Sequence, residues 1–271
     1  MPKVAGSSPV CSNGKMKILL TNDDGIFSEG LKILYENIKK IATVYVIVPE
    51  TERSATSHSI NLLNPLRVNE VKIDKFKCWV INGTPVDCVK IGIKELIKDK
   101  IDMVVSGINP GPNLGMDILY SGTVSAAGEG AILGIPSISI SIADYKNFKF
   151  NSAARITLKI LKKLEKIEFP KDTILNINIP NKELNEIKGI KITYQSESRF
   201  DEKYERRTDP RGNIYFWLKG SFKEAKGEKE SDVNAVKNGY VSITPINLNL
   251  TDYLFLNKLK SIKFEKISFK R

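Results

Sequence analysis

The sequence predicts an α/β fold with a mostly parallel sheet, and two patterns support this expectation. The apolar run at 18–20, the β-branched run at 43–48 and the mainly apolar stretch at 102–109 are typical of strands that are covered on both faces. Amphipathic stretches of helical period separate such runs, and this strand, helix, strand alternation is the signature of parallel βαβ units. With 271 residues and 41% hydrophobic composition, the chain can bury a full core.

The first part of the chain supplies several of these elements. Residues 28–40 carry apolar side chains at i, i+3, i+4 and i+7 from Leu31, which predicts a helix packed on a sheet. The β-branched run at 43–48 ends at Pro49 and forms the second strand. The next expected elements are strands at 66–73 and 76–81, which form an antiparallel excursion, and a helix that begins at Pro85 and runs to 98.

The middle of the chain continues the alternation. Hydroxyl and apolar side chains alternate over 136–142, so this strand should have one polar face. The other expected elements are a strand at 102–109, a helix opened by the glycine-punctuated stretch 121–130 and capped by Gly134, a helix at 152–166 and a strand at 173–179.

The character of the chain changes from residue 186. Residues 195–211 are dense in charge and lead through a turn at 209–212 to an aromatic strand at 214–218, which predicts a hairpin. An isolated hairpin is marginally stable in water, so we expect this arm to lie against another subunit. Strands at 190–194 and 239–246 and a closing helix at 251–263 are also expected.

These observations divide the chain into three parts. Residues 1–15 form a flexible N-terminal extension, residues 16–185 form the core, and residues 186–271 complete the core and serve oligomerisation. The extension lacks the apolar region of a secretory signal, and no run approaches the roughly 18 to 20 apolar residues of a spanning helix. We therefore expect no membrane association.

The charge and the cysteine content of the chain limit which classes of partner, metal site and cellular location fit the sequence. The net charge of +11 attracts anions, but the lysines are spread along the chain, so we expect an anionic small substrate and no stable nucleic-acid partner. Cys11, Cys78 and Cys88 are odd in number and lack a Cys-x-x-Cys pattern. This pattern suggests neither a disulfide framework nor a zinc site, and it favours a cytoplasmic location.

Polar side chains follow three predicted parallel strands. Asp23 and Asp24 precede Gly25 at the end of the first strand, Ser54 lies in a hydroxyl-rich loop after the second, and Asn109 ends a later one. If these strands are neighbours, the groups form an all-oxygen set that suits Mg²⁺, Mn²⁺ or Ca²⁺. Taken alone, the Asp-Asp-Gly sequence is equally consistent with a simple turn that has no ligand.

A second feature indicates an anion beside this set. Ser121, Gly122 and Thr123 open a helix, where free amides and the helix dipole hold phosphate. A metal beside phosphate implies phosphoryl transfer or hydrolysis. There is no P-loop motif, and no Gly-x-Gly-x-x-Gly follows the first strand, which disfavours NTP hydrolysis by that route and dinucleotide redox chemistry. His58 is a candidate for proton transfer. Glu129 is expected on a solvated face of the helix.

The motifs resemble those of the SurE family of metal-dependent nucleotidases from Met16 to about Ile246. The matching stretches are Thr21-Asn22-Asp23-Asp24-Gly25, Glu52-Arg53-Ser54-Ala55 with His58-Ser59, Gly83-Thr84-Pro85 with Asp87-Cys88-Val89, Ser106-Gly107-Ile108-Asn109 with Gly111-Pro112-Asn113, and Tyr120 to Ala127. The resemblance implies a Rossmann-like three-layer catalytic core, and a dimer or tetramer that exchanges the hairpin arm and the C-terminal helix. Ala55 is a departure, because many members have glycine there.

The resemblance and the residues together predict hydrolysis of nucleoside 5'-monophosphates, and of 3'-monophosphates, to nucleoside and phosphate. The expected catalytic residues are Asp23, Asp24 and Asn109, and these three with Ser54 would hold one Mg²⁺ or Mn²⁺ per subunit. The expected phosphate-binding residues are Asn109, Ser121, Gly122 and Thr123. The alternatives are a non-catalytic nucleotide- or polynucleotide-binding protein and a metal-dependent nucleotide-sugar transferase.

Overall fold

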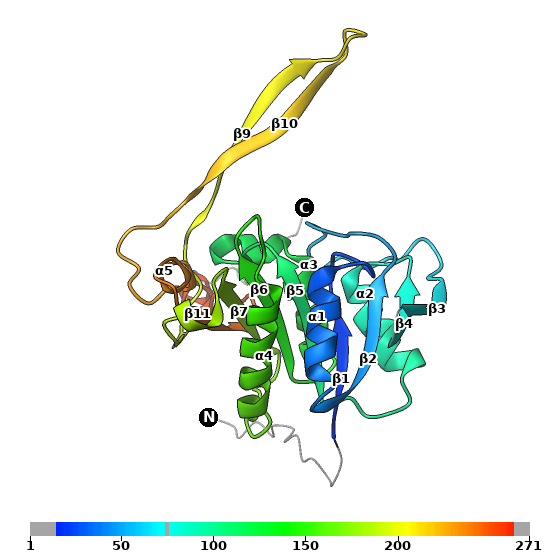
Figure 1. Ribbon diagram of the computed structural model, residues 1–271. Helices are drawn as coiled ribbons and strands as arrows, with labels where there is room; N and C mark the ends of the chain where they lie inside the picture. The colour runs from blue at the N-terminus through cyan, green and yellow to red at the C-terminus, as the bar shows by residue number, and fades with distance from the viewer. Residues whose placement is uncertain (1–14, 74–75, 263–271) are drawn as a thin grey trace, which may run out of the picture.

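A central sheet of nine strands organises the chain (Figure 1). The computed structural model describes residues 15–73 and 76–262, so the predicted extension, apart from Lys15, lies outside the described residues. The strands lie in the order β3 (Val68–Ile73), β4 (Phe76–Ile81), β2 (Ala42–Pro49), β1 (Met16–Thr21), β5 (Met103–Pro110), β6 (Ser137–Ala143), β7 (Thr173–Pro180), β11 (Val241–Asn247) and β8 (Ile190–Ile192).

The six strands from β4 to β7 in this order are parallel, which confirms the predicted α/β class. Strand β3 is antiparallel to β4 as expected, and β11 is antiparallel to β7. Strands β11 and β8, from the C-terminal part, thus extend the same sheet as the strands of residues 16–185.

Helices cover both faces of the sheet and give three layers (Figure 1). Helices α1 (Glu29–Ile38) and α4 (Phe150–Leu164) pack on one face, where Leu31, Leu34 and Ile160 join a core cluster with strand residues such as Leu20. On the other face, α2 (Pro85–Ile91) and α3 (Gly122–Ile132) bury Cys88, Val89 and Ala126 against β1 and β2. Within the described parts of the chain, no helix is long and apolar enough to cross a lipid bilayer.

The direction in which the sheet grows reverses between β1 and β5. From β1 the sheet extends through β2 and β4 on one side, whereas β5, β6 and β7 follow on the other side. Such a reversal opens a crevice at the carboxyl ends of the two central strands, where ligands bind in open α/β sheets. The strands before Asp23, Ser54 and Asn109 are therefore neighbours, as the sequence-based metal site required.

Local signals in the sequence explain where several helices start and end. Helix α2 has a capping box in which Thr84 and Asp87 bond reciprocally, with Pro85 in the first turn as predicted. It was expected to continue to 98, but from Gly92 it becomes a π-helical turn that ends at Leu96. Gly92 packs directly on β2, because an added Cβ would lie 2.4 Å from the Ile47 side chain.

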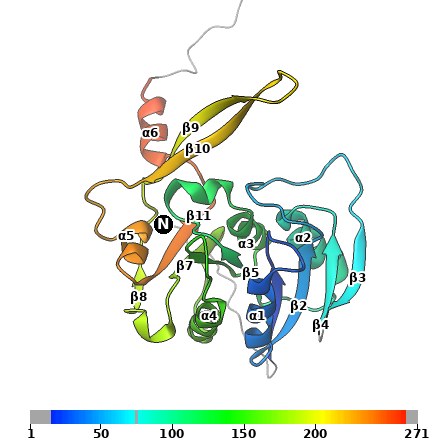
Figure 2. The ribbon, with the colours of Figure 1, turned by 45° about the horizontal axis from the view of Figure 1, so that its top comes forward.

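The C-terminal part contains a hairpin that projects away from the sheet (Figures 1 and 2). Strands β9 (Arg199–Thr208) and β10 (Ile214–Lys223) pair along their whole length, and β10 is longer than the expected 214–218. The closing helix α6 (Tyr253–Lys260) matches the predicted helix at 251–263 in place, although it is shorter. The short helix α5 (Asp232–Lys237), capped by Ser231, was not predicted.

Candidate metal and phosphate site

Asp23 lies directly beyond the carboxyl end of β1, and only 4% of its surface is exposed. One carboxylate oxygen accepts a hydrogen bond from the Thr123 amide at 3.2 Å, and the other accepts one from the Thr123 hydroxyl. Burial raises the pKa of Asp23, although the hydrogen bonds from Thr123 act to lower it. The first predicted acid is thus fixed against the start of α3.

Within the described residues, the Asp24 carboxylate has fewer hydrogen-bond partners than that of Asp23. In the described part of the chain, the Asp24 carboxylate accepts one hydrogen bond, from the Ser28 hydroxyl, and this bond is long, at 3.4 Å. Burial raises the pKa of Asp24 to about 7, and the neighbouring charges of Asp23 and Glu52 add to this rise. Adjacent carboxylates resist joint ionisation, and a bound cation removes that penalty. The pair therefore fits a divalent ion.

The loop after β2, residues 50–65, carries Ser54 to the same place. The Arg53 amide donates to the Asp23 carbonyl at 2.7 Å. Gly25, at a φ of +87°, approaches this loop so closely that a Cβ would lie 3.2 Å from the Thr51 backbone. Ser54 itself is exposed, and its hydroxyl donates to Glu52 at 2.7 Å. Its backbone is therefore close to the acids, while its side chain is paired with Glu52.

Asn109 approaches from the other side of β1, near the end of β5. The pairing of β5 with β6 shifts between Ser106 and Asn109, and an irregularity of this kind re-aims side chains. Glycine is needed at 107, because a Cβ there would lie 2.4 Å from the Ile140 carbonyl oxygen. The Asn109 amide nitrogen donates to the Gly111 carbonyl at 2.9 Å, which leaves its Oδ1 as an acceptor.

Helix α3 begins where the phosphate-binding turn was expected. Ser121 is its N-cap, with the hydroxyl accepting from the Val124 amide at 3.1 Å. Gly122 lies against Asp23, since an added Cβ would be 2.9 Å from the carboxylate oxygen. The Thr123 amide, which we expected to face phosphate, donates to Asp23 instead. The structure thus joins this turn to the first acid.

Buried amides hold the segment 110–121, which links Asn109 to the start of α3. The Asn113 carbonyl accepts from the Asn176 and Asn178 side chains at 2.8 and 2.9 Å, and its own side chain donates to Ser141 at 2.7 Å. The polar face expected on 136–142 is therefore buried, with Ser141 bonded to this segment. Sequence reasoning missed this network because its partners lie 63 and 65 residues from Asn113 along the chain.

His58 and Glu129 lie against each other between the loop 50–65 and α3. Glu129 is 3% exposed, so the expectation of a solvated face was wrong. It lies 3.1 Å from His58 and 2.7 Å from Lys90. Burial alone would raise the pKa of Glu129, but the hydrogen bonds from His58 and Lys90 bring it below its usual value. These contacts fasten the loop 50–65 to α3.

A polar pocket of about 580 Å³ adjoins the site through Arg53, whose backbone contacts Asp23. Its lining includes no acid. The lining residues are Arg53, Ile60, Asn61, Asn64, Pro65, Arg67, Asn82, Gly83 and Thr84. Arginine guanidinium and asparagine amide groups are well suited to contact the polar groups of a nucleotide.

The donor chemistry of the site defines which ion fits. Within residues 15–73 and 76–262, no three His, Cys, Asp or Glu side chains are grouped to hold a metal. An ion here would therefore depend on the two acids together with neutral oxygens from Ser54 and Asn109. Such an oxygen set matches Mg²⁺ or Mn²⁺ and is unlike the nitrogen and sulfur ligands of zinc.

Fold and site together define an α/β protein with paired acids at the switch point of its sheet, beside the start of helix α3. The family model described as survival protein SurE matches residues 18–202, a range that includes every predicted site residue. The chain belongs to the SurE family.

Relatives and a solved structure agree with this assignment. The chain is 50% identical over 240 residues to the 5'-nucleotidase SurE of Syntrophomonas wolfei, covering 88% of this chain and 91% of the relative. The 5'-nucleotidase SurE of Alkaliphilus metalliredigens is 46% identical over 254 residues, with coverage of 93% and 100%. The crystal structure of the SurE protein from Aquifex aeolicus superposes with a TM-score of 0.80 at 43% identity, covering 91% and 99%.

Proposed function

We propose that this protein is a metal-dependent phosphomonoesterase that hydrolyses nucleoside 5'-monophosphates, and 3'-monophosphates as well, to nucleoside and phosphate. The observation that carries the proposal is the double hydrogen bond from Thr123 to Asp23. It brings an acid pair that fits a cation to a helix start that fits an anion. The names of the relatives support the same activity, and they favour neither polynucleotide binding nor sugar transfer.

Asp23, Asp24, Ser54 and Asn109 would hold one Mg²⁺ or Mn²⁺ per subunit. The Ser54 hydroxyl would give up its bond to Glu52 to serve as a ligand, and Asn109 would offer its Oδ1, because its amide nitrogen already donates to the Gly111 carbonyl. When bound, the ion would polarise a phosphoryl oxygen and lower the pKa of a water molecule. The protein's contribution is to hold these oxygens in place before the substrate arrives.

The phosphate would lie at the start of α3, contacted by Asn109 and by the turn Ser121 to Thr123. Because the Thr123 amide is engaged by Asp23, we assign to Thr123 the orientation of the acid, and to Ser121 and Gly122 the closer approach to phosphate. The nucleoside would extend into the pocket that contains Arg53 and Arg67.

Asp23 is better suited to bind the ion than to attack phosphorus. Both of its oxygens accept hydrogen bonds from Thr123, and an acid that is held in this way and bound to a cation is a weak nucleophile. We therefore propose water as the nucleophile. His58 is held by Glu129 on the second turn of α3, and we propose no proton transfer by it.

The active protein would be a homodimer or homotetramer. The arm exposes a continuous apolar run, in which Phe216, Trp217 and Leu218 each have more than half of their surface in solvent. Helix α6 likewise exposes Leu254 and Phe255. A second copy of the chain would bury both elements.

The activity is tested by phosphate release from 5'-AMP and 3'-AMP in the presence of Mg²⁺ or Mn²⁺. Asp23→Asn and Asn109→Ala should each lower kcat/KM by at least about 100-fold, because each removes a ligand of the proposed ion. EDTA should abolish turnover of the wild-type protein. Near wild-type rates in both variants would show that the site is wrong.

The same assay separates the alternatives. Binding of RNA or DNA that survives EDTA, with no phosphate released from any nucleotide, would indicate a polynucleotide-binding protein. Turnover of nucleotide sugars without release of phosphate from monophosphates would indicate a transferase.

A further inference from the structure

A buried acid outside the proposed metal site contacts the segment 110–121, which links Asn109 to the start of α3. Asp232 is fully buried at the first position of α5. One carboxylate oxygen accepts from the Gly115 amide at 3.0 Å. The other accepts from the Ser196 amide at 3.0 Å and from the Val233 amide at 2.7 Å. Asp232 therefore joins three pieces of backbone that are distant in the sequence.

Gly115 belongs to the segment 110–121 that ends at the phosphate-binding turn. It begins a 3-10 helix, η2 (Gly115–Tyr120), which leads directly to Ser121. At a φ of +55°, Gly115 lies so close to the neighbouring chain that a Cβ would be 2.4 Å from the Ser198 carbonyl oxygen. The Gln195 side chain donates to the Gly115 carbonyl at 3.0 Å. The position of Gly115 is thus set from outside its own segment.

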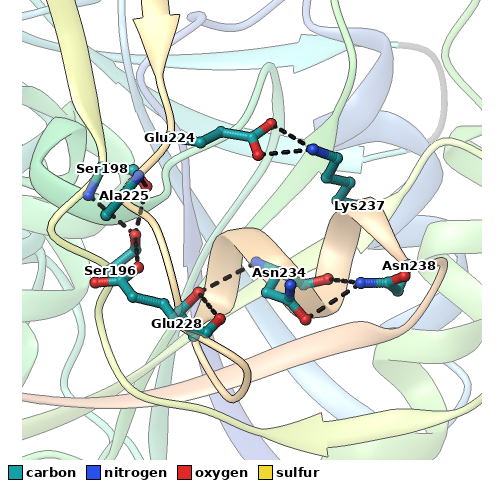
Figure 3. A network of polar contacts seen from close by, with 9 residues as sticks. Ser196, Ser198, Glu224, Ala225, Glu228, Asn234, Lys237 and Asn238 are labelled. Atoms are coloured by element: carbon teal, nitrogen blue, oxygen red, sulfur yellow. Dashed lines mark hydrogen bonds and ion pairs between the residues drawn. The ribbon is translucent and has the colours of Figure 1, made fainter.

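The residues that surround Gly115 form the root of the hairpin arm, which we define as residues 195–198 and 224–231. This root is closed by its own polar bonds (Figure 3). Glu228 accepts from the Glu197 amide at 2.9 Å and from the Ser196 hydroxyl, and the Ser198 hydroxyl accepts from the Ala225 amide at 2.9 Å. The two strands of the arm therefore leave from one closed unit.

We propose that Asp232 is a positioning residue for the reaction, because it ties the arm root to the segment that carries both Asn109 and the start of α3. This inference rests on the proposed nucleotidase function. A shift of the arm root would be transmitted through the Gly115 amide to the phosphate-binding turn. Catalysis would thereby depend on how the arm is held.

The chemistry of Asp232 favours this role. Both of its oxygens accept from backbone N–H groups, so asparagine, which has one acceptor oxygen and an NH₂ donor, would break the bond to Gly115 or the bond to Ser196. Glu228 provides a matched control, because it belongs to the same root and bonds Ser196 but makes no recorded bond to Gly115. Substitution of Asp232 tests the bond to Gly115, whereas substitution of Glu228 tests only the bonds within the arm root.

The experiment compares Asp232→Asn, Glu228→Gln and wild type in the full-length protein. Hydrogen exchange of residues 110–124 and the kinetics of 5'-AMP hydrolysis with Mg²⁺ are measured, with thermal unfolding as a check on folding. Asp232→Asn should speed exchange over 110–124 and raise KM at least about tenfold, since small displacements of positioning groups cost that much. Glu228→Gln should leave both readouts at wild-type values.

Two results would overturn the proposal. One is wild-type exchange and KM in folded Asp232→Asn, and the other is an equal loss in Glu228→Gln. If Asp232→Asn does not fold, Gln195→Leu replaces it. This variant removes the side-chain bonds to the Gly115 carbonyl, at 3.0 Å, and to the Met116 sulfur of the same segment, at 3.7 Å, and it should shift both readouts less but in the same direction. Absence of wild-type turnover would refute the nucleotidase function, and exchange alone would then decide whether Asp232 holds the segment.

Discussion

Position 55 shows how one side chain strains the loop that carries a proposed ligand. Ala55 follows Ser54 at a φ of +56°, in the left-handed region that favours glycine. The departure that the resemblance indicated at this position therefore has a conformational cost in this chain. The loop keeps its course because Arg53 and Ser57 are bonded to Asp23 and Tyr120.

We expect Ala55→Gly to raise the free energy of unfolding by about 0.5–1 kcal/mol. Relief of the left-handed strain, worth about 1–2 kcal/mol, exceeds the added chain entropy of glycine in the unfolded state. Denaturant unfolding measures the change. Ala225→Gly is the control, since Ala225 is not among the described residues with positive φ, and it should lower stability. A loss of stability in Ala55→Gly would contradict the strain.

The raised pKa of Asp24 predicts a pH-dependent stability of the metal-free protein. Since the folded pKa of about 7 exceeds the unfolded value of 3.8, the folded state holds the proton more tightly between these values. The contribution of Asp24 to the free energy of unfolding is therefore fully present at low pH, and it is lost as the pH rises towards 7.

In EDTA, Asp24→Asn should thus be more stable than wild type by about 2 kcal/mol above pH 7, and equal to it near pH 4. Urea unfolding across this range measures the difference. Added Mg²⁺ should stabilise wild type and leave the variant unchanged. A constant difference at all pH values would refute the assignment.

At the scale of elements, the loop 50–65 is fastened at both of its ends and at its middle. Arg53 bonds Asp23, His58 meets Glu129, and the Asn61 amide bonds Asp87 at 3.2 Å. The helices α2 and α3 therefore determine the place of Ser54 as much as β2 does. This anchoring would keep the Ser54 hydroxyl, on an exposed loop, within reach of the proposed ion.

Glu129→Gln should lower the free energy of unfolding by about 2 kcal/mol, because it leaves Lys90 and His58 facing a neutral group in a mostly buried position. It should also weaken Mg²⁺ binding through the loosened loop. Urea unfolding and metal titration are the measurements. Glu183→Gln, in the exposed pair with Lys149 at 2.8 Å, is the control and should lower the stability much less, because solvent screens this pair. Equal effects would contradict the anchoring.

Much of the element pattern follows from the sequence, because apolar period and turn residues are local. Strands β1, β2 and β5 and the hairpin were predicted in this way. Helix α5 has six residues, too few to show a period, although Ser231 and Gly239 flank it as end signals. The continuation of α2 as a π-helical turn depends on the contact of Gly92 with Ile47, which no local pattern reveals.

In the candidate site too, some residues could be predicted from local sequence patterns and others could not. Asp23, Asp24, Ser54 and Asn109 could be proposed as ligands, because the first three follow recognisable strands and Asn109 lies near the end of one. The residues that hold them could not be proposed, since Asn178 and Asp232 meet the segment 110–121 only in the folded chain. Their polar character appears in the sequence, but their partners do not.

For the whole molecule, the arm determines the expected assembly. We predict that Trp217→Glu shifts the protein from dimer or tetramer towards monomer, because Trp217 is 56% exposed in the middle of the apolar run on β10. Light scattering coupled to size exclusion measures the mass. Ile167→Glu, at an exposed apolar residue outside the arm, should leave the mass unchanged. A monomeric wild type, or an unchanged mass in Trp217→Glu, would refute this role of the arm.

The hydrogen bonds between Asp23 and Thr123 also have a kinetic consequence. They join residues 100 positions apart, and the bond from Gly115 to Asp232 spans 117. Contacts of such long range form late, after the intervening chain has been ordered. During synthesis, the acids of β1 emerge long before the helix start that orients them. Binding of the ion or of phosphate should therefore be among the last properties that the growing chain acquires. The appearance of this binding would then report that folding is complete.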